Sequence, residues 1–216
     1  MGNKRGYRLI YYMILALLMV APALAEEGGG WIALFDGKTL AGWRAEGKAD
    51  WTVKDGAIVG RQGAGGAPGD LYTEAEWADF ELEAEYKVHG PANSGIWFRR
   101  SASQPGYQAD ILDEPSYPDT FSGSLYAMGT GFLVANSDAT SVKKNDWNRL
   151  RIRAVGDEIV IGMNGKTVIQ ARDSRFPGAG SIGIQVHQGD NFKDMEIRVR
   201  KIRLRPLKGA LRSQAR

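Results

Sequence analysis

The stretch Phe80-Glu81-Leu82-Glu83-Ala84-Glu85-Tyr86-Lys87-Val88 decides the fold of this chain, because apolar and charged residues alternate along it. Successive side chains of a β-strand point to opposite faces, so the alternation predicts a strand with one buried and one solvated face. The pattern returns where Leu150, Ile152 and Ala154 alternate with Arg149, Arg151 and Arg153. Helical periodicity is nearly absent beyond the N-terminal segment, so an all-β protein is predicted.

Turn residues divide the chain between such strands. Asn164-Gly165 follows the row Ile159, Ile161 and Met163 and predicts a two-residue type I′ hairpin turn, and Asp55-Gly56 predicts a second one. The inward row that ends at Val199 slips phase to Ile202, which predicts a β-bulge near Lys201. About twelve short antiparallel strands with glycine-rich connections indicate a sandwich or a barrel.

The N-terminus predicts export. A basic region with Lys4, Arg5 and Arg8 precedes the apolar run 9–20, and Ala23-Leu24-Ala25 places small residues where a signal peptidase reads. We therefore expect a signal peptide over residues 1–25, with an uncleaved membrane anchor as the alternative. The expected products are a single domain over 26–207 and a basic tail over 208–216, in the periplasm or the medium, with no stable membrane insertion after cleavage.

Net charge limits the expected binding partners, and cysteine content limits how the domain can be stabilised. Removing residues 1–25 removes three positive charges and no acid, so the formal net charge of +3 falls to zero. A neutral chain has no general attraction for polyanions, and nucleic acid is not an expected partner. The chain has no cysteine, so packing alone must hold the exported domain together. The oligomeric state is not predicted.

Candidate functional residues lie on the strand faces that are not core. If Ile96, Phe98, Ala109, Ile111, Ile184, Val186, Ile197 and Val199 point inward, the residues between them point outward. These outward residues are Trp97, Arg99, Gln108, Asp110, Gln185, His187, Arg198 and Arg200. We expect Trp97, Arg99, Gln108, Asp110, Gln185, His187 and Arg200 to cluster on one outer sheet surface.

These residue types suit a carbohydrate. An aromatic ring stacks on the apolar face of a sugar, and arginine, glutamine and aspartate bind neighbouring hydroxyls. The competing interpretation is that outward strand residues are polar merely because they are solvated. His187 is the more notable of the two histidines, since His89 lies at a strand end before Gly90-Pro91.

Several motifs in order resemble one known family. They are Leu34-Phe35-Asp36-Gly37-Lys38-Thr39-Leu40 with Gly42-Trp43, Trp51-Thr52-Val53-Lys54-Asp55-Gly56, Asp79-Phe80-Glu81-Leu82, Asn93-Ser94-Gly95-Ile96-Trp97-Phe98-Arg99, Gly106-Tyr107-Gln108-Ala109-Asp110, Gly123-Ser124-Leu125-Tyr126, Trp147-Asn148, Asn164-Gly165, and Ile184-Gln185-Val186-His187 with Gly189. The chain resembles the domain of unknown function 1080 family, also called the 3-keto-disaccharide hydrolase domain, from about residue 31 to residue 207. Many members have Glu and Gln where this chain has Gln108 and Asp110, and Asn where it has Lys201.

The resemblance implies a concanavalin-like jelly roll of two antiparallel sheets, lectin-like in fold, that cleaves glycosides oxidised to a ketone at C3. Such chemistry needs a base, an acid and a group that stabilises an enolate oxygen. The implied catalytic residues are His187 and Asp110 as base or acid and Arg99 at the enolate. The implied substrate-binding residues are Trp97, Gln108, Tyr126, Gln185 and Arg200.

No cofactor is predicted. A divalent metal could replace arginine as the electrophile, but His187 and Asp110 offer only two ligands, so no metal site is expected. Two other functions stay open. One is a non-catalytic carbohydrate-binding module, for which Trp97 would matter more than His187. The other is an ordinary two-carboxylate glycosidase, for which Asp110, Asp113 and Glu114 are the clustered acids.

Overall fold

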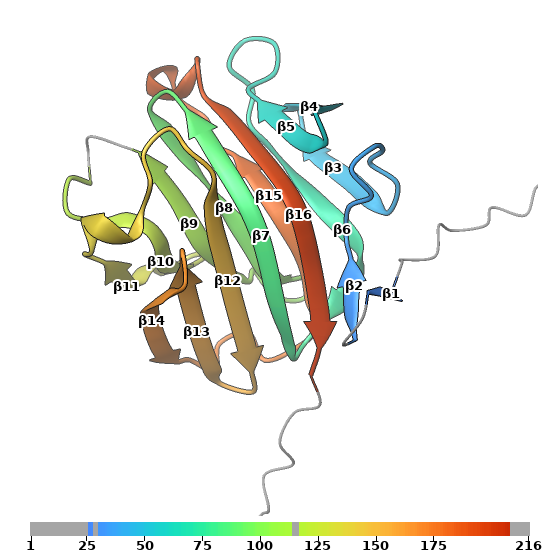
Figure 1. Ribbon diagram of the computed structural model, residues 1–216, viewed down its shortest axis with the longest axis vertical. Helices are drawn as coiled ribbons and strands as arrows, with labels where there is room; N and C mark the ends of the chain where they lie inside the picture. Colours follow the sequence, from blue (N-terminus) through green and yellow to red (C-terminus); the bar gives the residue numbers. More distant parts are fainter. Residues whose placement is uncertain (1–25, 28–29, 114–116, 208–216) are drawn as a thin grey trace, which may run out of the picture.

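The computed structural model describes residues 26–27, 30–113 and 117–207 (Figure 1). The predicted signal peptide 1–25, the tail 208–216 and Glu114 lie outside the described residues. Among the described residues, no helix is long and apolar enough to cross a membrane.

Two antiparallel sheets pack face to face and confirm the predicted sandwich, a jelly roll. Sheet A has nine strands: β1 (Glu26–Glu27), β2 (Trp31–Ala33), β4 (Asp50–Lys54), β5 (Ala57–Arg61), β7 (Phe80–His89), β12 (Asn148–Val155), β13 (Glu158–Met163), β14 (Lys166–Arg172) and β16 (Glu196–Pro206). Sheet B has seven, in the spatial order β11 (Gly131–Asn136), β10 (Phe121–Ala127), β9 (Tyr107–Asp113), β8 (Ala92–Arg100), β15 (Gly180–Val186), β6 (Gly69–Trp77) and β3 (Trp43–Gly47). In Figure 1, β12, β7 and β16 of sheet A lie in front of β9, β8 and β15 of sheet B. Two short 3₁₀ helices, η1 (Ala139–Ser141) and η2 (Asp190–Phe192), complete the described elements.

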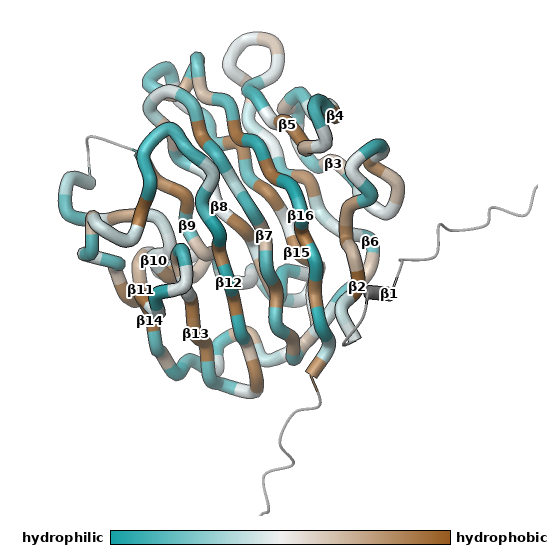
Figure 2. Tube along the Cα trace, viewed as in Figure 1, coloured by the Kyte–Doolittle hydropathy of each residue, from teal (hydrophilic) through white to brown (hydrophobic). Residues whose placement is uncertain are grey.

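The core forms where the inward faces of the two sheets meet. Four apolar members of the deciding stretch, Phe80, Leu82, Ala84 and Tyr86, are at most 1% exposed, and the fifth, Val88, is half-buried. Figure 2 shows the resulting alternation of hydrophilic and hydrophobic residues along β7, β12 and β16. Each strand therefore gives one row of side chains to the core and one row to an outer face.

Backbone conformations confirm the turns and the bulge. Asn164 and Gly165 have φ of 51° and 89°, and Asp55 and Gly56 have 52° and 72°, the positive values that a type I′ turn requires. Lys201 has φ of 50°, and the pairing of β16 with β7 shifts register between Arg200 and Arg203. Because of the extra residue, Ile202 and Leu204 again point toward the core.

Candidate functional site

The outer face of sheet B brings several predicted site residues together. Trp97 of β8 pairs with Gln108 of β9, which pairs with Tyr126 of β10, so the three lie in one row across the sheet. The Trp97 and Tyr126 rings meet edge to face, with centroids 6.3 Å apart. In the next row, Asp110 pairs with Gly95 on β8.

The far half of this second row comes from β15, β6 and β3. Gln185 of β15 pairs with Asp70 of β6, which pairs with Glu46 of β3. Strands are about 4.8 Å apart, so two spacings, about 10 Å, separate the backbone at Asp110 from that at Gln185. One strand, β8, lies between them and contributes only Gly95 to the row.

Two glycines provide the room in which larger side chains pack on this face. A Cβ atom at Gly95 would lie 2.5 Å from the side chain of Gln108, so Gln108 lies over Gly95. Its Nε2 donates a hydrogen bond of 3.0 Å to Oε1 of Gln185. A Cβ atom at Gly183 would lie 2.3 Å from the Tyr72 ring. The glycines therefore let long polar and aromatic side chains lie flat on the sheet.

Asp110 is the most unusual group on this face. Its residue is 4% exposed, and among the described residues its Oδ1 has no hydrogen-bond partner. Burial raises the pKa of Asp110 well above its ordinary value, because water no longer stabilises the carboxylate. A buried carboxyl with an unpartnered oxygen costs stability, which makes Asp110 the leading candidate on this face for a functional role.

Sequence analysis missed a second carboxyl group, Asp70. Trp97 donates its indole N–H to Oδ1 of Asp70 at 2.9 Å, which orients the indole ring. Burial raises the pKa of Asp70, and the hydrogen bond from Trp97 opposes that rise. Asp70 and Tyr72 flank the core residue Leu71, so period-two alternation over residues 70–72 could have identified both.

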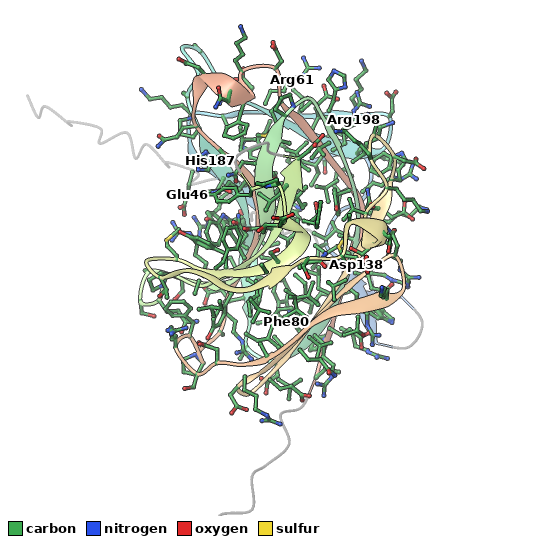
Figure 3. The ribbon with its side chains drawn as sticks, turned by 90° about the vertical axis from the view of Figure 1, so that its left-hand side faces the viewer. Glu46, Arg61, Phe80, Asp138, His187 and Arg198 are labelled. Carbon is green, nitrogen blue, oxygen red and sulfur yellow. The ribbon has the colours of Figure 1, made fainter. Side chains whose placement is uncertain are left out.

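His187 follows the end of β15 and lies at the open side of the site. It lines a pocket of about 380 Å³ with Glu46, Asp70 and Gln185, and Figure 3 shows His187 and Glu46 on the same side of the sandwich. Its Nδ1 lies 2.6 Å from the carbonyl oxygen of Gln188. A carbonyl oxygen only accepts hydrogen bonds, so Nδ1 carries a proton, and Nε2 is the ring atom left to exchange a proton with a ligand.

The prediction that Arg99 points outward is wrong. Arg99 has φ of 54°. Four residues of β8, Trp97 to Arg100, lie opposite only three residues of β15, Ser181 to Gly183, so the register shifts there. This bulge turns Arg99 into the protein, where its side chain is fully buried. It donates to the carbonyl oxygens of Ala78 at 2.7 Å and Gly156 at 2.8 Å. Its guanidinium therefore contacts the protein interior and not the outer face of sheet B.

The neighbouring Arg100 takes the place on the outer face that had been expected for Arg99. Its Nε donates to the hydroxyl oxygen of Tyr72 at 2.5 Å, and its guanidinium lies 5.0 Å from the centroid of the Tyr72 ring. The side chain of Arg100 is 27% exposed, so it is accessible from the site.

The prediction that Arg200 joins this cluster is also wrong. Arg200 belongs to β16 of sheet A, where it pairs with Glu85 at 2.7 Å and stacks on the Trp147 ring at 3.8 Å. Arg198 lies on the same strand, apart from His187 in Figure 3. Arg198 and Arg200 do point outward as predicted, but alternation cannot show which of the two sheets a strand belongs to.

A metal site would need several donor side chains close together. Across the described residues, no group of three or more His, Cys, Asp or Glu side chains is placed to hold a metal ion. The outer face of sheet B combines the buried acid Asp110, the half-buried acid Asp70, an accessible imidazole, two amides and three aromatic rings. Trp97 and Gln108 are only 2% and 4% exposed, so the half-buried Tyr126, Gln185 and His187 are the members that a polyhydroxylated ring can reach.

Comparison with known proteins decides the family. Residues 30–205 match the family model of the 3-keto-alpha-glucoside-1,2-lyase-like domain. This chain belongs to that family. A relative named 3-keto-disaccharide hydrolase, from Bacteroides thetaiotaomicron, is 30% identical over 68% of this chain and 60% of the relative, so the chain spans less than two thirds of that protein.

Solved structures show how widely the fold of this 3-keto-glucoside lyase-like domain is shared. A glycosyl hydrolase candidate from Parabacteroides distasonis is 22% identical, with a TM-score of 0.64 over 82% of this chain and 99% of that chain. The carbohydrate-binding module CBM66 from Bacillus subtilis is 19% identical, with a TM-score of 0.59 over 75% of this chain and 94% of that chain. At these identities the likeness concerns the fold alone.

Proposed function

We propose that this domain cleaves 3-keto-glycosides by β-elimination followed by hydration, a net hydrolysis, outside the cytoplasm. The observation that carries the proposal is the Asp110 carboxyl, buried on the outer face of sheet B with one unpartnered oxygen and a raised pKa. Family membership and the name of the Bacteroides relative support the substrate class.

The reaction balances without an oxidant or reductant. The C3 carbonyl acidifies the C2 hydrogen, and a base removes it to give an enolate. The enolate electrons then form the C1–C2 double bond as the C1–O bond breaks, and an acid protonates the departing oxygen. Water adds across the double bond, with hydroxide at C1 and a proton at C2. The products are a free 3-keto sugar and an alcohol.

The positions of the residues support a proposed role for each. Asp110 is the proposed base, because its buried carboxyl with a raised pKa is a stronger base than an exposed one. His187, with a proton on Nε2 as well as on Nδ1, is the proposed acid, because it lines the open pocket through which a leaving group can depart. The amide of Gln185, whose oxygen accepts from Gln108, can turn its N–H₂ toward the enolate oxygen in the place proposed from sequence for Arg99.

Two rival functions fit less well. A pure binding module gains nothing from a buried, unpartnered carboxyl, which a neutral amide could replace at lower cost. An ordinary glycosidase needs two carboxyls about 5–9.5 Å apart. The backbones at Asp110 and Asp70 lie three strand spacings apart, about 14 Å, and the Trp97 indole holds the Asp70 carboxyl, which makes this pair a poor match for that mechanism.

Label incorporation tests the eliminative route. We expect the mature protein to release a chromogenic alcohol from a 3-keto-glucoside but not from the unoxidised glucoside, which serves as the control. In D₂O the product should carry deuterium at C2, since that proton is removed and later replaced from solvent. Turnover without C2 label, after correction for spontaneous exchange of the ketone, would contradict elimination and favour direct displacement.

The same proposal includes export. The basic region at Lys4–Arg8, the apolar run and Ala23-Leu24-Ala25 support cleavage after Ala25. N-terminal sequencing of the exported protein should find Glu26 first. Ala25→Leu should block processing, because the peptidase reads a small residue at this position, whereas Leu24→Ile at the unread position beside it should not. Exported protein that retains Met1 would contradict cleavage.

A further inference from the structure

The outer face of sheet A carries an arrangement of charges that the proposed chemistry does not use. Three glutamates of β7 lie in a central row, and each pairs with two cations. Glu81 and Glu83 take one cation from β12 and one from β16, whereas both partners of Glu85 come from β16. Glu81 pairs with Arg151 and Arg205, Glu83 with Arg149 and Arg203, and Glu85 with Arg200 and Lys201, at N–O distances of 2.5–2.9 Å. Cations therefore outnumber acids two to one in these pairs.

The acids lie beneath the cations. The side chains of Glu81 and Glu83 are 5% and 13% exposed, whereas those of Arg151 and Arg149 are 55% and 57% exposed. Although burial acts to raise the pKa of Glu83, hydrogen bonds from Arg149 and Arg203 outweigh it and hold the pKa below its ordinary value. The face that solvent meets is consequently cationic, even though the chain without residues 1–25 has no formal net charge.

A groove follows the arginine row of β12. A cavity of about 230 Å³ is lined by Arg149, Arg151, Arg153, Gly162 and Thr167, with Val160, Glu83, Gly165 and Lys166. Gly162 pairs with Arg151 on one side and Thr167 on the other, so a residue without a side chain forms the floor between them. A Cβ atom at Gly162 would have no neighbour closer than 3.5 Å, which leaves the floor open.

We propose that this groove binds a linear polyanionic glycan, a chain of sugars bearing carboxylates or sulfates. The arginines repeat every second residue of one strand, about 6.8 Å apart. Arg153 pairs with the partly exposed Glu158 at 3.0 Å, so Arg149 and Arg151, whose acid partners lie beneath them, are the cations most open to a ligand. Guanidinium groups bind carboxylates and sulfates well, and the Thr167 hydroxyl can bond a sugar hydroxyl. The groove is one strand wide, which suits a single sugar chain better than a flat bilayer or a wide duplex. The site lies on the opposite sheet from Asp110, and it does not depend on the proposed reaction.

Polygalacturonate is the probe for this site, with its methyl-esterified form as the uncharged control. At about 50 mM salt we expect binding that weakens steeply as salt rises, because counterions compete for the arginines. Arg149→Gln with Arg151→Gln should weaken binding about ten-fold or more. Glu83 and Glu81 keep Arg203 and Arg205 as partners in this variant.

Matched variants separate the groove from general charge and from folding. Lys48→Gln with Lys193→Gln removes the same charge from exposed positions outside the groove and should leave affinity unchanged. Thr167→Glu should weaken binding while Thr167→Gln, of equal size, should not, and thermal melting checks that each variant is folded. Failure of the wild type to bind at low salt, or equal loss in the Lys48/Lys193 control, would overturn the proposal. Equal or tighter binding of anionic vesicles or duplex DNA through Arg149 and Arg151 would overturn the assignment of the ligand.

Discussion

Replacing Asp110 by asparagine is expected to slow turnover of a 3-keto-glucoside by about 10²–10⁴-fold, the usual contribution of a positioned base. Asparagine keeps the shape of the side chain but cannot take a proton. Affinity for the substrate should change far less, because Trp97, Tyr126 and Gln185 remain in place. Steady-state kinetics that separate kcat from KM check this expectation.

Asp113→Asn is the matched control, since Asp113 ends the same strand but pairs with Lys144 at 3.2 Å and is partly exposed. It should leave turnover near that of the wild type. The pH profile adds a second criterion. If Asp110 is the base, wild-type kcat/KM should rise with pH through the raised pKa of Asp110, and this limb should be absent from the residual activity of Asp110→Asn. Equal turnover of the two variants would exclude Asp110 from proton transfer.

The same substitution should make the protein more stable at neutral pH. Burial raises the pKa of Asp110, so the folded state binds this proton more tightly than the unfolded state does. Asp110 therefore makes its full contribution to the free energy of unfolding below about pH 4, the pKa that it has in the unfolded chain. This contribution is lost as pH rises toward the higher pKa that Asp110 has in the folded protein. Asparagine mimics the protonated form, so its advantage in melting temperature should appear at neutral pH and vanish in acid. A residue kept for chemistry at a cost in stability has this signature.

Replacing Arg99 by alanine is expected to destabilise the fold by about 3–5 kcal/mol, as when one partner of a buried charged network is removed. Its side chain is fully buried and bonds Asp79 at 3.2 Å as well as the carbonyl oxygens of Ala78 and Gly156. Without the guanidinium, these oxygens lose donors that water cannot readily replace. Urea unfolding monitored by tryptophan fluorescence measures the loss.

Arg100→Ala separates structure from function at the adjacent position. Arg100 is partly exposed and bonds the Tyr72 hydroxyl, so we expect a stability loss of about 1 kcal/mol. Similar losses at both positions would mean that the bulge at Arg99 does not exist in solution. A catalytic defect in Arg99→Ala that persists in the fraction that remains folded would restore the role first predicted for Arg99.

Sequence alone determined the elements of this fold. Alternation in residues 80–88 and 149–154 predicted the strands, Asn164-Gly165 and Asp55-Gly56 predicted the turns, and the phase slip near Lys201 predicted the bulge. These features are local, because side-chain period and turn chemistry are fixed by neighbouring residues. Alternation also placed Trp97, Gln108, Asp110 and Gln185 on an outer face, and the family motifs added Tyr126.

Only the tertiary structure decided which outer face each residue occupies. Arg200 obeys the alternation but lies on sheet A, because strand order depends on pairings between segments far apart in sequence. One extra residue in β8 turned Arg99 inward and Arg100 outward, which no apolar pattern around them reveals. The buried state of Asp110 likewise depends on neighbours from other strands, and burial is what raises its pKa. The sequence determined the types of residue available for chemistry, and long-range packing determined which of them meet and in which protonation state.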